Sequence, residues 1–389
     1  MGRGRRHRLT SVGPAAPGGK LEGPSPHWRR VRLLALLLIV PLLAGCLADD
    51  DADDPAGSDD AETSFAAALH EGMPPMVYDA DAAIAWWEDI SSNYPKHDSN
   101  LPTNTMLRER IVSDLEDLGL DVEVRMYPGE FQGQVVPESQ LTMLYAIIAT
   151  KPGTTMPDHR IGLVSHYDTQ TATIHGAYDD ASGVAADFHI CKALAQVPMN
   201  KTLACIFFDG EERGLVASKH YVEDVVLAGD EDYVYDFVMG YDMTGINWPG
   251  HPWHLYAMAG ELWGVPGDAA SADVSPMFPF AQDLLNDVLA YPTDGVEVRP
   301  DSLRNSDERR FKEAGVPIIR FAGGLNASDY DQYHMPLDTV DHVYEFAGGP
   351  DNFKAGFSAI IEASYATALA LDKTTIEEMA AAYGFNVTA

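Results

Sequence analysis

Cysteine is scarce in this chain of 389 residues, which contains only Cys46, Cys191 and Cys205. Cys191 falls in an expected helix and Cys205 lies in the middle of the apolar run TLACIFF (202–208). Both positions favour buried free thiols. An exported protein would also permit a disulfide between them, so that alternative stays open.

Basic side chains are also few: the chain has 26 Lys and Arg against 59 Asp and Glu. The first 46 residues contain 8 of the basic and 1 of the acidic residues, so the remainder has 18 against 58 and a net charge near −40. A field of that sign excludes a nucleic-acid partner. It is typical of halophilic proteins, in which concentrated salt screens the self-repulsion. The alternative is an acidic secreted protein without salt adaptation.

The apolar run LLALLLIVPLLA (33–44) is short. It has about half of the roughly 20 residues that a membrane-spanning helix needs. A basic segment precedes it and the small residues Ala44 and Gly45 stand at its end, which predicts a secretory signal peptide over residues 1–46. The ending LLAGC resembles a lipobox, in which Cys46 becomes the lipidated first residue. We therefore expect an exported protein, lipid-anchored to the outer face of the cytoplasmic membrane; ordinary cleavage and secretion is the alternative.

Residues 47–75 begin with the acidic, small-residue stretch LADDDADDPAGSDDAET. This composition predicts a disordered tether. Residues 76–389 then form the expected globular domain, in which we find neither an internal repeat nor a second linker. The apolar content of the whole chain, 46%, is enough for a large core.

Expected strands and helices alternate along this domain. The strands are expected at 121–127, 141–150, 160–168, 202–208, 232–243, 253–259, 295–300 and 317–324, and the helices at 82–90, 105–119, 181–196, 280–291 and 352–372. Several of the strands are apolar throughout, which indicates burial on both faces. The pattern predicts a single α/β domain with a mostly parallel mixed sheet and helices on both faces.

Polar residues follow successive strands of this expected sheet. They are His166 and Asp168, Asp179 and Asp180, Glu211 and Glu212, Asp242, and finally His334. Each alone has an ordinary explanation: a solvated turn, a helix N-cap, a surface pair of acids or a loop histidine. Together they lie where parallel sheets gather functional groups. Imidazole and carboxylate are also the ligands of hydrolytic zinc sites.

The segments HYDT, GAYDDASG, EERGLVAS, YDMTG and YHMPLDT resemble, in order and spacing, the co-catalytic dizinc exopeptidases. This family includes bacterial leucyl aminopeptidase, aminopeptidase Y and the glutamate carboxypeptidases. The resemblance extends from about residue 100 to 370, and NSDERRFKEAGVPIIR (305–320) is also similar to a segment of that family.

The resemblance implies roles for these residues. His166 and Asp242 would hold one zinc ion, Glu212 and His334 a second, and Asp179 would bridge both. Asp168 would orient His166, and Glu211 would act as general base on a water shared by the two ions. The family also has a cis peptide bond after the bridging aspartate, here Asp179–Asp180.

The activity implied is that of a metallo-exopeptidase, most simply an aminopeptidase acting on the N-terminal residue of peptides. A carboxypeptidase or dipeptidase of the same fold, or a glutaminyl cyclase-like acyl transferase with one zinc ion, is the alternative. Two non-enzymes also remain, a binding module on a peptidase scaffold and a lipid-anchored solute-binding protein; the complete ligand set argues against both.

Several features stay undetermined by the sequence. Three tryptophans after Asp242 could line an apolar substrate pocket or simply pack: Trp248, Trp253 and Trp263. A carboxypeptidase would need an arginine for the terminal carboxylate, and Arg309, Arg310 and Arg320 are candidates. Glycosylation of the sequons at Asn200, Asn326 and Asn386, the native metal, the side-chain preference and the oligomeric state are not encoded in any pattern we recognise.

Overall fold

The computed structural model describes residues 9–11, 63–129, 142–229, 231–247, 255–259, 275–289, 296–299, 306–324 and 329–385. These residues belong to one compact unit. Several predictions fall outside them: most of the signal peptide, Cys46, the acidic stretch to residue 62, the three tryptophans, Asn326 and Asn386.

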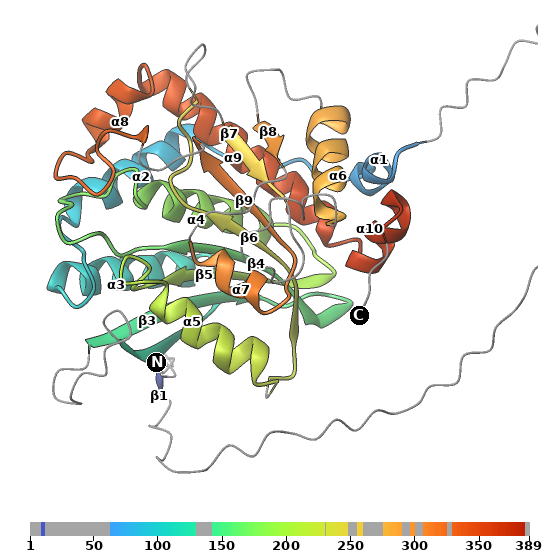
Figure 1. The fold of residues 1–389 in the computed structure, drawn as a ribbon, viewed down its shortest axis with the longest axis horizontal. Helices are drawn as coiled ribbons and strands as arrows, with labels where there is room; N and C mark the ends of the chain where they lie inside the picture. Colours follow the sequence, from blue (N-terminus) through green and yellow to red (C-terminus); the bar gives the residue numbers. More distant parts are fainter. Residues whose placement is uncertain are drawn as a thin grey trace, which may run out of the picture. The chain divides into compact units, whose positions relative to one another are not determined.

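A nine-stranded sheet runs through the described residues in the order β1-β2-β3-β5-β4-β6-β9-β7-β8 (Figure 1). Five of the neighbouring pairs are parallel and three are antiparallel, so the predicted mostly parallel mixed sheet is confirmed. The strands are β1 (Leu9–Ser11), β2 (Asp121–Gly129), β3 (Thr142–Lys151), β4 (Met156–His166), β5 (Lys201–Phe208), β6 (Val234–Tyr241), β7 (Leu255–Met258), β8 (Val296–Arg299) and β9 (Ile318–Gly323). The backbone of β1 comes from the segment expected to be the signal peptide.

Helices cover both faces of this sheet. They are α1 (Phe65–His70), α2 (Ala80–Asn93), α3 (Pro102–Asp117), α4 (Ala181–Ala195), α5 (Val216–Val222), α6 (Met277–Gln282), α7 (Glu308–Glu313), α8 (Val340–Phe346), α9 (Pro350–Leu371) and α10 (Ile376–Tyr383), with π-helical continuations η2 (Glu223–Leu227) and η4 (Asp283–Val288). In the described part of the chain, no helix is both long and apolar enough to cross a membrane.

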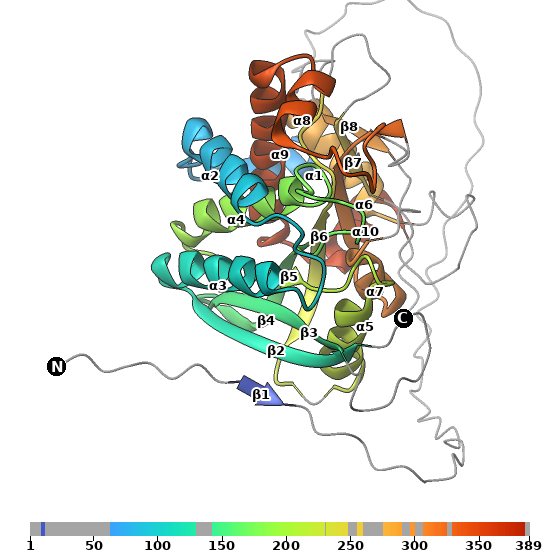
Figure 2. The same ribbon diagram turned by 90° about the vertical axis from the view of Figure 1, so that its left-hand side faces the viewer.

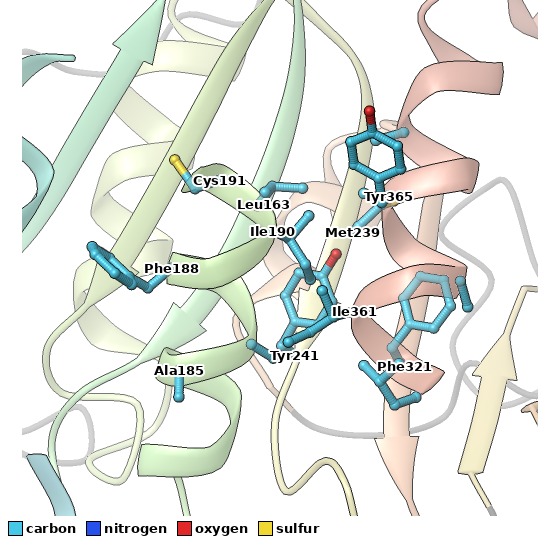
Figure 3. Packing of buried hydrophobic residues seen from close by; sticks show 14 of the residues in the cluster. Leu163, Ala185, Phe188, Ile190, Cys191, Met239, Tyr241, Phe321, Ile361 and Tyr365 are labelled. Carbon is cyan, nitrogen blue, oxygen red and sulfur yellow. The ribbon is translucent and has the colours of Figure 1, made fainter. Parts of the chain in front are cut away.

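The strand β5 explains why the sheet is covered on both sides. Its residues Leu203, Cys205 and Phe207 enter one apolar cluster, and the alternate residues Ala204, Ile206 and Phe208 enter another. The first cluster is completed by α2, α3, α4 and α9, and the second by α5 and α7 (Figure 2). Because successive side chains of a strand point to opposite faces, an all-apolar strand requires two cores. Figure 3 shows the first of them, where α4 and α9 pack side by side on the sheet.

The N-terminal boundary of the domain differs from the prediction. The tether was expected to reach residue 75, yet α1 begins at Phe65 and buries Ala66 completely. The Ser64 hydroxyl donates a hydrogen bond to Asp283 in η4 (2.7 Å), and Lys373 Nζ donates to the carbonyl of Leu69 (2.7 Å). The helix was not predicted because it is short, follows an acidic segment and is held by residues that are distant in the sequence.

The expectation of free thiols at Cys191 and Cys205 is wrong, because the two residues form a disulfide. Cys191 lies on α4 and Cys205 lies on β5, directly under that helix, and both side chains are fully buried. Buried cysteines are usually free. Here the packing of α4 on β5 brings the two sulfur atoms together, which the spacing of 14 residues did not indicate.

Candidate metal centre

The site lies where the strand order of the sheet reverses. β5 pairs with one edge of β4 and β6 with the other, all three in parallel. The connections after these strands therefore leave in opposite directions and open a crevice at their carboxyl ends. His166 ends β4, Glu211 and Glu212 follow β5, and Asp242 follows β6.

Two groups of candidate metal ligands meet in this crevice. Within each group, the ligand atoms lie within 4.8 Å of one another. One group consists of His166, Asp180 and Asp242, and the other of Asp179, Glu212 and His334. The first group is buried and the second is partly accessible. All five ligands expected from the sequence are thus brought together.

Asp179 lies between the two groups. Its Oδ1 atom is 3.5 Å from His166 Nε2, and its Oδ2 atom is 3.3 Å from His334 Nε2. One carboxylate therefore faces both imidazoles, one with each oxygen. The peptide bond from Asp179 to Asp180 is cis, as the family resemblance predicted.

Glu212 completes the second group. Its Oε2 atom lies 3.2 Å from His334 Nε2, while its Oε1 atom is buried and has no hydrogen-bond partner. A buried carboxylate oxygen without a partner is costly unless a cation occupies the site. The imidazole and carboxylate donors and this open oxygen fit a divalent ion such as zinc.

His334 is held in the left-handed backbone region, with φ at 58°. This conformation is uncommon for residues other than glycine and persists where the surrounding structure imposes it, often at functional sites. Burial lowers the pKa of His334, but hydrogen bonds to Asp179 and Glu212 outweigh burial and raise it to about 10. Without a metal ion, a protonated imidazole therefore supplies positive charge to these two acids.

Asp168 supports the site from below and is fully buried. Its two carboxylate oxygens accept the backbone N–H groups of Glu211 (3.1 Å) and Glu212 (3.3 Å). His166 Nδ1 lies 3.1 Å from the carbonyl oxygen of Asp168 and 3.5 Å from its Oδ1 atom. Asp168 thus fixes the loop that carries the two glutamates as well as the ring of His166.

Glu211 faces the same crevice, half-buried. Burial raises the pKa of its carboxyl group well above the ordinary value; His166 opposes this shift, and the charges of Glu212 and Asp242 add to it. A carboxyl group with a raised pKa, at the edge of two ligand groups and outside both of them, is suited to accept and release a proton.

Three residues support the site in roles that were not assigned to them from the sequence. Asp180 was expected to be an ordinary N-cap, and it does cap α4 by accepting the N–H of Gly183 (2.9 Å). The same Asp180 Oδ1 atom accepts the N–H of Met243 (3.0 Å), which follows Asp242. The Oδ2 atom of Asp180 also lies 3.4 Å from the backbone nitrogen of His166, a contact that depends on how the connection between β4 and α4 folds back and that no local pattern encodes.

Asp338 is the second of these residues, and it was not named from the sequence. Its carboxylate accepts the N–H of Tyr178 (2.9 Å), the N–H of Asp179 (3.0 Å) and the hydroxyl of Tyr330 (2.9 Å). It lies four residues after His334, in the same YHMPLDT segment. Asp338 therefore joins the loop of His334 to the loop of Asp179. That segment was the only signal in the sequence.

Arg320 is the third. It is buried on β9, and its guanidinium lies 2.8 Å from Asp242 Oδ2 and 3.1 Å from Glu308 Oε1. The sequence offered Arg309, Arg310 and Arg320 as candidates for binding a terminal carboxylate. All three are engaged: Arg309 and Arg310 pair with Glu313 at 2.8 and 2.9 Å.

Comparison with known proteins agrees with this geometry. The sequence profile described as peptidase family M28 matches residues 146–348, just over half of the chain. The chain therefore belongs to peptidase family M28, and the resemblance drawn from the sequence is confirmed.

Individual relatives are more distant. Aminopeptidase YwaD of Bacillus subtilis is 28% identical over 184 residues, which are 46% of this chain and 36% of YwaD. The match thus spans little more than a third of that protein. Among solved structures, a zinc aminopeptidase from Bacillus subtilis aligns with a TM-score of 0.58 at 16% identity, covering 78% of this chain and 97% of its own. A glutaminyl cyclase of Fimbriiglobus ruber has the same TM-score and identity and is covered completely, so these similarities establish the fold alone.

Proposed function

We propose that this protein is a zinc-dependent aminopeptidase that holds two zinc ions and hydrolyses the N-terminal residue of peptides. The observation that carries the proposal is the position of Asp179, whose two oxygens face His166 and His334 at 3.5 and 3.3 Å. A carboxylate shared by two donor groups is the arrangement that a pair of cations requires. The names of the relatives, aminopeptidase and zinc aminopeptidase, support the same activity.

In this proposal His166 and Asp242 would hold one ion, Glu212 and His334 would hold the other, and Asp179 would be a ligand shared by both. Zinc there would supply Lewis acidity, which lowers the pKa of a water molecule and stabilises negative charge on the substrate carbonyl oxygen. Glu211 accepts the proton of the attacking water and delivers it to the leaving amine. Asp168 keeps Glu211 in reach, because it binds the backbone N–H of that residue.

An unblocked N-terminus is the favoured substrate because none of the three arginines considered for binding a terminal carboxylate is free to do so. Arg320 is buried between Asp242 and Glu308, and Arg309 and Arg310 are paired with Glu313. This disfavours the carboxypeptidase alternative.

The test is turnover by the zinc-loaded protein at low and at high salt. A panel of aminoacyl-p-nitroanilides and dipeptides should be hydrolysed, whereas their N-acetylated counterparts should not. A peptide with N-terminal glutamine serves as the comparison. If that peptide is cyclised to pyroglutamate and no aminoacyl substrate is hydrolysed, the glutaminyl cyclase alternative is correct and the aminopeptidase proposal is wrong.

We further propose export and lipid anchoring through Cys46. The signal-like first 46 residues support export, and so does the Cys191–Cys205 disulfide, since disulfides persist mainly outside the cytosol. A Cys46→Ser variant should then lose the lipid adduct in mass spectrometry and move from the membrane fraction to the medium. An unmodified Cys46 in the wild-type membrane fraction would contradict the anchor.

A further inference from the structure

The ion pair between Arg320 and Asp242 is unusual because one partner is an expected metal ligand. Arg320 lies on β9 opposite Gly240 of β6, and Asp242 is two residues beyond Gly240. Side chains at paired positions, and at i and i+2, point to the same face of a sheet. The Arg320 guanidinium therefore reaches Asp242 along the sheet, and its 2.8 Å distance to Oδ2 follows from the strand register.

A second acid holds this guanidinium in place. Glu308, at the start of α7, accepts from Arg320 at 3.1 Å and is buried. Gly240 provides the room, because a Cβ atom there would lie 2.8 Å from both Cγ and Oε2 of Glu308. Any residue larger than glycine at position 240 would displace Glu308, so the close packing of Glu308 on β6 depends on this glycine.

The guanidinium remains charged in this environment. An arginine side chain keeps its charge in proteins, and two carboxylates pair with this one. Arg320 is thus a permanent cation beside one of the two ligand groups. The described residues of the other group, Asp179, Glu212 and His334, have no ion pair to an arginine or lysine.

We propose that Arg320 makes the two metal positions unequal: it weakens the position of His166 and Asp242 and leaves the position of Glu212 and His334 to hold the tightly bound ion. Arg320 neutralises part of the charge of Asp242, occupies Oδ2 and leaves only Oδ1 for a metal. It also repels a second cation. In return, Asp242 stays in its ligating position when the weaker ion dissociates. This inference rests on the proposed function, because it presumes a site for two zinc ions.

The experiment measures zinc binding to the metal-free, full-length protein by competition with a chromophoric chelator and by calorimetry. We expect two classes of site whose dissociation constants differ by at least roughly a hundredfold, and Asp242→Asn should remove the weaker class only. The test variant is Arg320→Met/Glu308→Gln, which removes one charge of each sign and leaves Asp242. In this variant the weaker class should bind zinc at least tenfold more tightly.

The matched control is Arg309→Met/Glu313→Gln, which removes a pair of the same type from the exposed side of α7. It should leave both dissociation constants unchanged. If the test variant does not fold, Arg320→Lys retains the charge but cannot pair with both acids in the same way, and it should shift the weaker class in the same direction by a smaller factor.

Two results would overturn the inference: two indistinguishable zinc sites in the wild type, or a weaker class that is unchanged or looser in the test variant. If the wild type shows one measurable zinc site and the test variant shows two, the inference is supported, because the weaker site of the wild type is then too weak to measure. These outcomes are distinct from failure of the proposed function, which would appear as no tight zinc binding and no hydrolysis of aminoacyl substrates.

Discussion

Glu211 and Glu212 are adjacent in the chain, but the fold places their carboxyl groups in different surroundings. The backbone N–H groups of both bind Asp168, which fixes the turn after β5. From that turn Glu212 reaches His334, whereas Glu211 belongs to neither ligand group. Under the proposed function, these two like charges at the end of a buried strand would have different tasks: Glu212 would hold a cation and Glu211 would move a proton.

Glu211→Gln tests this division. The substitution keeps the size and removes the base, so zinc binding should be retained while kcat falls by about 10²–10⁴. The measurements are zinc content by metal analysis and hydrolysis of an aminoacyl-p-nitroanilide. Glu212→Gln is the matched comparison and should lose zinc as well as activity. Near-normal kcat in Glu211→Gln would show that another group is the base.

Asp338→Asn tests the link between the loops of His334 and Asp179. An amide cannot accept both N–H groups, so one buried donor loses its partner, at a cost of about 2 kcal/mol in the free energy of unfolding. Zinc affinity should fall roughly tenfold or more, as for other residues that orient ligands. Asp341→Asn, an exposed change three residues further on, is the control. Wild-type zinc affinity in Asp338→Asn would mean that the link is dispensable.

At the scale of single residues, the sequence indicated the expected metal ligands better than the residues that hold those ligands in place. His166, Asp179 and Glu212 occur in segments with a recognisable order. Arg320 and Asp338 act through contacts with residues 78 and 160 positions away, Asp242 and Tyr178. No local pattern encodes such contacts, because they depend on strand register and loop packing.

Among the elements, length decided what could be predicted. α3 and α9 span 16 and 22 residues, enough for several turns of apolar periodicity. α5, α7 and α8 have six or seven residues each and were missed, since two turns give little periodic signal. The missed helix α1 also follows an acidic, small-residue stretch. Its stability comes from tertiary contacts, as is usual for short helices.

Paired substitutions in α1 test whether it belongs to the domain. Ala66 is fully buried and Ala68 is exposed. Ala66→Glu should therefore cost about 3 kcal/mol and lower the melting temperature by roughly 5–10 °C, because it buries an unpaired charge. Ala68→Glu on the same helix should have little effect. Calorimetry of both variants measures the difference. Equal melting temperatures would show that α1 does not belong to the domain and that the tether extends to residue 75.

At the scale of the whole molecule, several acidic side chains are buried in the interior. Burial raises the pKa of Glu212 and of Asp338 to about 7 and that of Asp307 to about 8. In the metal-free protein these groups bind protons more tightly when folded than when unfolded. The stability that they contribute is therefore present at low pH and is lost as the pH rises from about 4 through 8. The raised pKa of His334 acts in the same direction, up to about 10.

We therefore expect the metal-free protein to melt at a temperature lower by roughly 5 °C or more at pH 8 than at pH 5. Zinc should reverse this slope, because its ligands must be deprotonated to bind it. Calorimetry in the presence of chelator and of zinc measures both effects. A metal-free protein that is more stable at pH 8 than at pH 5 would refute the interpretation that these buried carboxyl groups have raised pKa values.

The sequence predicted the architecture at this scale, since strands apolar on both faces leave few alternatives to a covered parallel sheet. It could not place the domain boundary or pair the cysteines. Both depend on how α1 and α4 pack on segments far away in the chain.

The attachment of α1 also shows at which end of the sheet the chain enters the folded domain. Lys373 binds the carbonyl of Leu69, and its neighbour Asp372 accepts the N–H of Lys201, the first residue of β5. The crevice with the two ligand groups lies beyond Phe208, at the other end of that strand, roughly 25 Å away. If the proposed anchor at Cys46 is present, the chain would therefore join the folded domain on the side away from the crevice, and the point of attachment would leave the crevice open to peptides.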